Sequence, residues 1–167
     1  MFGEFVKTEI DTELKMIDLN VVAYHILTKL FLQDFVRKDK GYILNVCSSA
    51  GFMAGPGMAT YYATKNYITK LTMAINEELR ASKSHVVVSA LCPGPVATEF
   101  NQVAHGTFAI REASSYEVAK YAIDKLMKKK MIIVPTFFMK LTLFFNRFAP
   151  YRLSLYIAYK IQKRKTR

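Results

Sequence analysis

The sequence predicts an α/β fold, in which a small parallel sheet carries helices on both faces. Two observations support this prediction. Short β-branched, apolar runs at 42–46, 86–91 and 131–134 are typical of buried strands. Long segments at 9–36 and 61–80 place apolar residues at helical spacing, and they alternate with the strands. Alternating strands and helices favour a parallel sheet.

The first helix, 9–36, contains one unusual residue. Its apolar face recurs at the spacing of a helix, with Leu14, Ile17, Val21, Tyr24, Leu27, Leu30 and Phe31. Asn20 falls within it. An asparagine inside a helix is disfavoured and usually points to solvent, so a second interpretation is that function retains it.

A hydroxyl, a phenol and an ammonium are expected to converge where the first strand ends. Ser48 follows that strand, at the carboxyl edge where open α/β sheets bind ligands. Tyr61 and Lys65 are four apart on the next helix and therefore share a face, whereas the alternative, Tyr62, is only three from Lys65. A nearby ammonium should lower the pKa of the Tyr61 phenol from about 10.

This group of side chains predicts proton transfer. Tyr61 would give a proton to a carbonyl oxygen or take one from an alcohol, while Ser48 holds the same oxygen by a hydrogen bond. No side chain donates a hydride, so a redox reaction here needs a nicotinamide.

Three motifs together resemble the short-chain dehydrogenase/reductase family over roughly residues 2 to 135. They are Asn-x-x-Ser-Ser-x-Gly at 45–51, Tyr-x-x-x-Lys at 61–65 and Pro-Gly-Pro-Val-x-Thr at 93–98. The resemblance implies a Rossmann-like, doubly wound sheet. It also implies NADP or NAD as cofactor and a small carbonyl or alcohol substrate. The catalytic residues that it implies are Asn20, which would hold a proton-relay water, Ser48, Tyr61 and Lys65, and the cofactor-binding residues are Tyr61, Lys65, Pro93, Gly94, Val96 and Thr98.

The family's Gly-rich dinucleotide half has no counterpart in this sequence. Gly51, Gly55 and Gly57 imitate its spacing, but Pro56 removes an N–H that would bind phosphate, and no second strand follows, so a turn lining the substrate pocket fits better. We therefore expect a truncated sheet with an unpaired edge at 42–47. We also expect the chain alone to be inactive as an enzyme. A truncated gene product, a partial gene model and half of a split protein all remain open.

The tail differs from the rest in charge. Residues 120–167 contain 13 Lys and Arg and one acid, whereas residues 1–119 contain 11 and 12. We expect a catalytic part at 1–136 and a basic, aromatic-rich helical extension at 137–167. The extension could lie on an anionic membrane, cover the pocket or contact an oligomer partner. No nucleic-acid motif accompanies the charge, so nucleic acid is not expected.

The predicted function is an NAD(P)-dependent oxidoreductase that interconverts a ketone and a secondary alcohol. The alternative is a non-catalytic remnant or interaction protein. We expect a cytoplasmic protein that could also associate with a membrane, without a metal and with reduced thiols at Cys47 and Cys92. The resemblance implies that the helices at 9–36 and 61–80 would pair two copies of a complete chain into a homodimer. Apolar residues that favour a lipophilic substrate are Phe52, Met53, Met58, Phe100 and Phe108.

Overall fold

The computed structural model describes residues 3–98 and 112–163. Phe100 and Phe108, two of the residues expected to favour a lipophilic substrate, lie outside these residues. In chain order the helices and strands are η1 (Phe5–Lys7), α1 (Ile10–Ile17), η2 (Asp18–Ala23), α2 (Tyr24–Arg37), β1 (Tyr42–Val46), η3 (Ser49–Phe52), α3 (Ala59–Ala81), β2 (Val87–Leu91), α5 (Ser115–Met127), β3 (Ile132–Ile133), α6 (Phe137–Asn146) and α7 (Tyr151–Lys163).

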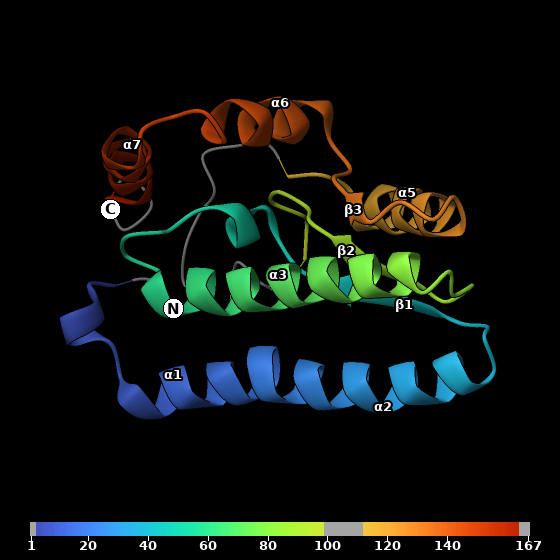
Figure 1. Ribbon diagram of the computed structural model, residues 1–167. Helices are drawn as coiled ribbons and strands as arrows, with labels where there is room; N and C mark the ends of the chain where they lie inside the picture. The colour runs from blue at the N-terminus through green and yellow to red at the C-terminus, as the bar shows by residue number, and fades with distance from the viewer. Residues whose placement is uncertain (1–2, 99–111, 164–167) are drawn as a thin grey trace.

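The three strands form one parallel sheet in the order β1-β2-β3, which confirms the predicted α/β fold (Figure 1). β1 and β2 are in register along their whole length, with Tyr42 opposite Val87 and Val46 opposite Leu91. Their carboxyl ends therefore lie at the same edge of the sheet. β1 pairs with β2 alone among the described residues, so the other side of β1 is an edge of this sheet.

Helices cover both faces of the sheet, as predicted. On one face α2 and α3 pack against Ile43 and Val88. On the other face α5 packs through Val118, Ala122 and Leu126 against β2 and β3. Successive strand residues point to opposite faces, which is why nearly every residue of these strands is apolar. The fully buried Ile68 and Val88 mark the interior.

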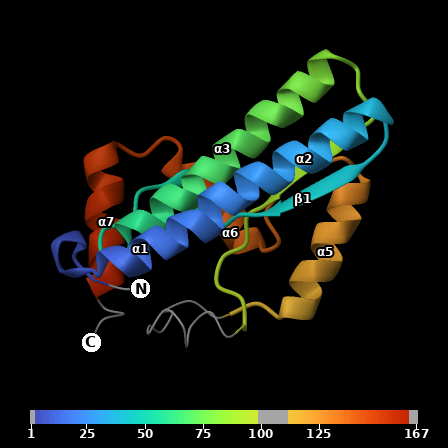
Figure 2. The ribbon, with the colours of Figure 1, turned by 90° about the horizontal axis from the view of Figure 1, so that it is seen from below.

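The predicted helix 9–36 is a single rod with a change of winding in its middle. α1 and α2 are joined through the π-helical segment η2, and the rod runs alongside α3 (Figure 2). Asn20 lies within η2. Short π-helical insertions are uncommon and frequently occur at functional sites, because they rotate the side chains of one helix against its neighbour.

α6 and α7 form a layer on the side of the molecule opposite α1 and α2 (Figure 1). Met139 of α6 is buried in the same core cluster as Cys47 and Ile68, so this helix packs on the sheet rather than apart from it. α7 is fixed by Gln162, whose amide nitrogen donates to the Tyr62 hydroxyl at 2.9 Å.

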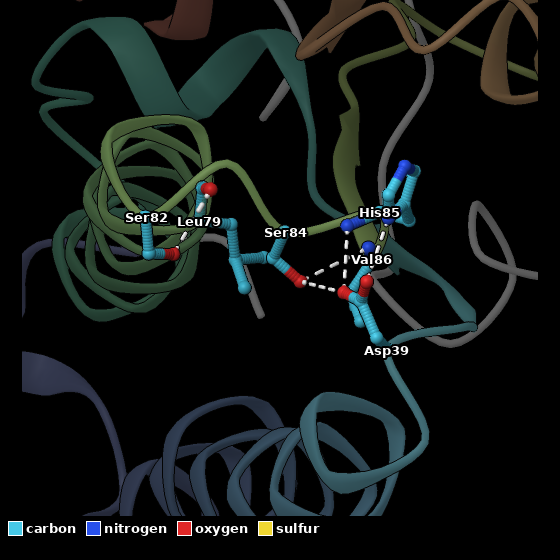
Figure 3. Close-up of polar contacts among 6 residues, drawn as sticks. All are labelled: Asp39, Leu79, Ser82, Ser84, His85 and Val86. Atoms are coloured by element: carbon cyan, nitrogen blue, oxygen red, sulfur yellow. Dashed lines mark hydrogen bonds and ion pairs between the residues drawn. The ribbon is translucent and has the colours of Figure 1, made fainter.

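A polar turn closes the opposite edge of the sheet, before β1 and β2 begin. The carboxylate of Asp39 accepts hydrogen bonds from the Ser84 hydroxyl and the His85 backbone N–H, both at 2.9 Å (Figure 3). The Asp39 backbone has a φ of 45°, a left-handed conformation that aspartate tolerates better than most residues. This contact joins the two loops that lead into the paired strands.

Candidate active site

Ser48 lies where β1 ends and directly before the short helix η3. Its side-chain oxygen accepts a hydrogen bond from the backbone N–H of Ala50 at 3.1 Å, so the residue caps η3. The Ser49 N–H donates to the Pro93 carbonyl oxygen at 2.8 Å, which joins the loops that follow β1 and β2. The serine is thus held at the carboxyl edge of the sheet, where ligands bind in folds of this kind.

Tyr61, in the first turns of α3, brings its phenol to Ser48. The two side chains are hydrogen bonded, and Tyr61 is half-buried. Tyr62 points elsewhere: its hydroxyl accepts from Gln162, and its ring lies edge-on to that of Tyr61 with centroids 6.0 Å apart. The structure therefore pairs Tyr61, and not Tyr62, with the serine.

Lys65 extends from α3 to the end of β1. Its ammonium donates to the Val46 carbonyl oxygen at 3.1 Å and lies 5.9 Å from the centroid of the Tyr61 ring. Burial lowers the pKa of this ammonium, since the charged form loses its water shell. Ser48, Tyr61 and Lys65 thus come together at one edge of the sheet, as the sequence predicted.

The expected lowering of the Tyr61 pKa is wrong for the chain as it stands here. Burial raises the pKa of the phenol, and the hydrogen bond with Ser48 opposes this only in part. Removal of water from the phenolate is the largest cause of this rise, and the Lys65 ammonium donates a hydrogen bond to the Val46 carbonyl oxygen. Tyr61 is therefore a neutral phenol, able to donate its proton.

Asn20 is linked to Tyr61 through a residue that sequence reasoning missed. Its amide nitrogen donates to the Thr64 hydroxyl at 3.2 Å, and that hydroxyl donates to the Tyr61 carbonyl oxygen at 2.8 Å. The contact spans 44 positions of the chain, so only the packing of η2 against α3 brings the two side chains together. Asn20 is half-buried, which excludes the fully solvated interpretation.

The loop after β2 holds the expected cofactor-contacting residues Pro93, Gly94, Val96 and Thr98. Val96 forms a bridge with Ala113, and the Ala97 N–H donates to the Ala113 carbonyl oxygen at 2.9 Å. The Thr98 hydroxyl lies 3.4 Å from the Val96 carbonyl oxygen. A methyl group on Gly94 would meet the side chain of Met139, so α6 rests directly on this loop.

The three glycines at 51–57 serve packing and turn geometry, which agrees with the predicted turn. A side chain on Gly51 would collide with Thr69, and one on Gly55 would collide with the ring of Tyr62. The space beside these two glycines is thus filled by the protein and not left open for a phosphate. Within residues 3–98 and 112–163, the groups that suit a dinucleotide are those suited to its ribose and nicotinamide end, Tyr61, Lys65 and the 93–98 loop.

Two further residues hold the site in place, and the sequence around them did not predict this role. The Tyr24 hydroxyl donates to the same Val46 carbonyl oxygen as Lys65, at 3.2 Å. The Asn66 amide nitrogen lies within 2.9 Å of the carbonyl oxygens of Ala50 and Met53, and so holds η3 against α3. Tyr24 follows Asn20 by one helical turn, and this spacing was the available signal.

Two of the apolar residues expected around the substrate, Phe52 and Met58, belong to the protein interior or pack against it. Met58 is buried, and Phe52 packs against the core cluster that contains Cys47 and Ile68. These two therefore contribute to the interior beneath the site more than to its surface. Cys47 and Cys92 are free, buried thiols, as predicted.

The parallel sheet with helices on both faces is a Rossmann-like arrangement, and serine, tyrosine and lysine side chains lie at its carboxyl edge. The sequence profile described as short chain dehydrogenase matches residues 1–107. The chain therefore belongs to the short-chain dehydrogenase/reductase family.

Relatives and solved structures agree with this assignment. The chain is 33% identical over 110 residues to "Dehydrogenase/reductase SDR family member 11" of Bos taurus, covering 64% of this chain and 43% of the relative. A short-chain dehydrogenase from Sphingobium yanoikuyae in complex with NADPH superposes with a TM-score of 0.74 at 26% identity, covering 82% of this chain and 54% of that structure. The bulky-bulky ketone specific alcohol dehydrogenase from Comamonas testosteroni gives 0.68 at 25% identity, covering 81% and 50%. The chain thus spans about half the length of the proteins it matches.

Proposed function

We propose that this chain carries the catalytic part of a dehydrogenase/reductase that interconverts a ketone and a secondary alcohol with NADP or NAD. The observation that carries the proposal is the hydrogen bond between the Ser48 hydroxyl and the Tyr61 phenol, with the Lys65 ammonium beside the tyrosine ring. The non-catalytic alternative is not favoured, because all three side chains that the chemistry needs are present and adjacent.

The proposed reduction moves one proton through Tyr61. The ketone oxygen accepts a hydrogen bond from the Ser48 hydroxyl and the proton of the neutral Tyr61 phenol, whose raised pKa keeps it protonated at neutral pH. When bound, a nicotinamide would supply the hydride that the carbonyl carbon requires. The Lys65 ammonium stabilises the phenolate that remains, 5.9 Å from its ring centroid.

In this proposal Asn20 positions Tyr61, while Ser48, Tyr61 and Lys65 carry out the chemistry. Through Thr64 it connects η2 with the backbone of Tyr61. This link fixes the first turns of α3 against the rod formed by α1, η2 and α2. A proton-relay water held by Asn20, as the family resemblance implies, is part of the same proposal.

The cofactor would be held here at its ribose and nicotinamide end. Tyr61, Lys65 and the loop with Pro93, Gly94, Val96 and Thr98 are the groups for it, and the NADPH complex of the Sphingobium yanoikuyae enzyme supports this cofactor class. Turnover would then require phosphate-binding groups like those of a Gly-rich dinucleotide half, because the glycines at 51–57 pack against Thr69 and Tyr62. The chain alone should accordingly be inactive.

A lipophilic ketone or secondary alcohol is the proposed substrate class. The similarity to a dehydrogenase described as specific for bulky-bulky ketones supports it. The placement of α6 over the 93–98 loop, through Met139 and Gly94, adds an apolar wall next to the site.

A homodimer is proposed through two neighbouring helices, the rod formed by α1, η2 and α2 and the helix α3 beside it. Several large apolar side chains on this rod are exposed, among them Leu19 at 66%, Leu30 at 58% and Phe31 at 55%. A patch of this kind on a helix pair favours burial by a second copy.

The test restores a Gly-rich dinucleotide half, taken from a family member, in front of this chain. The fusion should oxidise NADPH or NADH in the presence of lipophilic ketones. Tyr61→Phe keeps the ring but removes the proton donor, so turnover should fall by roughly 100-fold or more. Tyr62→Phe is the matched control and should change turnover little, because its hydroxyl faces Gln162. Equal losses in both variants, or a larger loss for Tyr62→Phe, would refute the assignment.

A further inference from the structure

The outer face of α6 is unusual because it is apolar although it faces away from the protein. Met139 is buried and Leu143 half-buried on the inner side. The residues of the outer side recur at the spacing of one helical face, are 44–77% exposed and continue into the turn after α6 with Phe148: Phe137, Phe138, Leu141, Phe144 and Phe145. A helix that packs on a domain ordinarily shows the opposite arrangement, with polar residues outward.

α7 shows the same arrangement, with large side chains facing away from the protein. It meets the protein through its small and polar residues, since Ser154 and Ala158 are half-buried and Gln162 is 5% exposed. Its larger side chains are exposed, with Tyr151 at 89%, Tyr156 at 56% and Ile157 at 48%. α6 and α7 lie on the side of the molecule opposite α1 and α2 (Figure 1), and most of their exposed large side chains are aromatic.

The charge of this surface distinguishes it from the apolar rod on the other side. After Asp124 the sequence contains no acidic residue, and Lys140, Arg147, Arg152 and Lys160 are exposed on or beside α6 and α7. The rod also has exposed apolar residues, but it carries acids such as Asp11, Asp18 and Asp34 among its basic residues. Mixed charge suits a protein partner, whereas aromatic side chains among basic residues alone suit an anionic lipid surface.

We propose that α6 and α7 form a docking surface for an anionic membrane, along which both helices lie. Phenylalanine rings would enter the boundary between headgroups and acyl chains, tyrosines would remain at headgroup level, and lysine and arginine would contact the lipid phosphates. None of the helices in the described parts of the chain is long and apolar enough to cross a bilayer, so the contact is peripheral.

This surface is connected to the candidate active site. α6 touches the cofactor-side loop through Met139 and Gly94, and α7 holds Tyr62, the neighbour of Tyr61, through Gln162. A membrane bound at α6 and α7 would therefore lie next to the wall of the site. Lipid docking itself does not depend on the proposed oxidoreductase activity, and its test uses no substrate.

The experiment measures co-sedimentation of the 167-residue chain with vesicles. Vesicles of equimolar phosphatidylglycerol and phosphatidylcholine should bind the chain, phosphatidylcholine alone should bind it much less, and added salt should weaken binding. Two variants test the surface itself. Arg152→Glu with Lys160→Glu and, separately, Phe138→Ser with Phe145→Ser should each reduce the partition coefficient by roughly tenfold or more.

Matched controls change the same chemistry elsewhere. Lys15→Glu with Lys29→Glu reverses two exposed charges on the rod, and Ile123→Ser with Met127→Ser removes two exposed apolar side chains from α5. These controls should bind as the unaltered chain does. Circular dichroism checks that every variant keeps its helices. We expect this result because all substituted side chains are exposed.

Three results would overturn the proposal. The first is no binding to the anionic vesicles. The second is equal binding by the α6–α7 variants and their controls. The third is light scattering that detects self-association dependent on Phe138 and Phe145 without vesicle binding, which would assign the surface to a second copy of the chain.

Discussion

The Lys65 ammonium and the Val46 carbonyl oxygen are joined by a hydrogen bond of 3.1 Å, which fastens α3 to the end of β1. Tyr24 donates to the same oxygen from α2, at 3.2 Å. One backbone carbonyl at the sheet edge therefore receives a side chain from each of the two helices that cover this face. The position of the lysine beside Tyr61 is fixed from both sides.

Replacing Lys65 should separate activity from stability. Burial lowers the pKa of its ammonium, so the folded state disfavours the charged form, and this cost is present at neutral pH because the ammonium is charged below its pKa. Lys65→Met keeps most of the volume and removes the buried charge. We expect a thermal midpoint that is equal or higher, together with an activity at least roughly 100-fold lower in the fusion with a dinucleotide half.

Lys70→Met, at an exposed position of the same helix, is the control for Lys65→Met and should alter neither quantity strongly. A large drop in the midpoint of Lys65→Met would contradict the interpretation. It would mean that the hydrogen bond to Val46 and the contacts with the Tyr24 and Tyr61 rings outweigh the cost of burying the ammonium.

Two glycines near the site should respond differently to the same added methyl group. At Gly51 the methyl group would collide with Thr69 and would lie 2.8 Å from the Lys65 carbonyl oxygen, a backbone atom that cannot move freely. At Gly94 it would lie 2.8 Å from a carbon of the flexible Met139 side chain. Urea unfolding should give a loss of about 1–3 kcal/mol for Gly51→Ala and less than about 1 kcal/mol for Gly94→Ala. The reverse order would show that α3 yields more easily than α6.

The elements and the three central site residues could be predicted because each depends on local sequence. Tyr61 and Lys65 are one helical turn apart, and the strand before Ser48 is a continuous apolar run. These local patterns are the same however the helices and strands pack against one another. The capping of α5 by Ser114, whose hydroxyl accepts from the Glu117 N–H, is predictable for the same reason.

The remaining features depend on contacts between distant parts of the chain. The π-helical winding at Asn20 and its bond to Thr64 arise from the packing of η2 on α3. The direction of the Tyr61 pKa shift depends on how much water the fold removes, and the Lys65 side chain has another acceptor in Val46. Neither the amount of water removed around Tyr61 nor the acceptor that Lys65 finds can be predicted from the charges and spacing in the sequence. The outward aromatic face of α6 is likewise evident only once Met139 is known to be buried.

A buried polar network should be required for the packing of α2 and α3 on β1. The Asn45 side chain accepts from the Thr28 hydroxyl at 3.3 Å and donates to the Thr72 hydroxyl at 2.9 Å. Asn45→Ala leaves the Thr28 hydroxyl buried without its acceptor, so the free energy of unfolding should fall by about 1–3 kcal/mol. The second substitution Thr28→Val removes that hydroxyl, and a double-mutant cycle should recover part of the loss. Strict additivity of the two substitutions would exclude an energetic role for the Thr28–Asn45 bond.

The turn at Asp39 should make folding stability depend on pH in the acidic range. The Asp39 carboxylate lies 2.6 Å from His85 Nδ1 and accepts hydrogen bonds from the His85 N–H and the Ser84 hydroxyl (Figure 3). The side-chain contact with His85 is the largest cause that lowers the pKa of Asp39, from 3.8 to about 2. Asp39 is exposed, so its contribution is reduced by solvent and salt.

The sign of this dependence follows from the direction of the shift. A carboxylate whose pKa is lower in the folded chain than in the unfolded chain stabilises the fold above pH 3.8, and this contribution is lost as the pH falls from 3.8 through about 2. Asp39→Asn keeps the side-chain size and tolerates the same left-handed backbone, but it does not titrate. Urea midpoints recorded through this range should fall with decreasing pH less steeply for Asp39→Asn than for the unaltered chain. Asp124→Asn, on the exposed surface of α5, is the control and should keep the original slope. If Asp39→Asn and the unaltered chain lose stability in parallel, the contact with His85 does not stabilise the fold, and the link between the loops that precede β1 and β2 depends on the backbone alone.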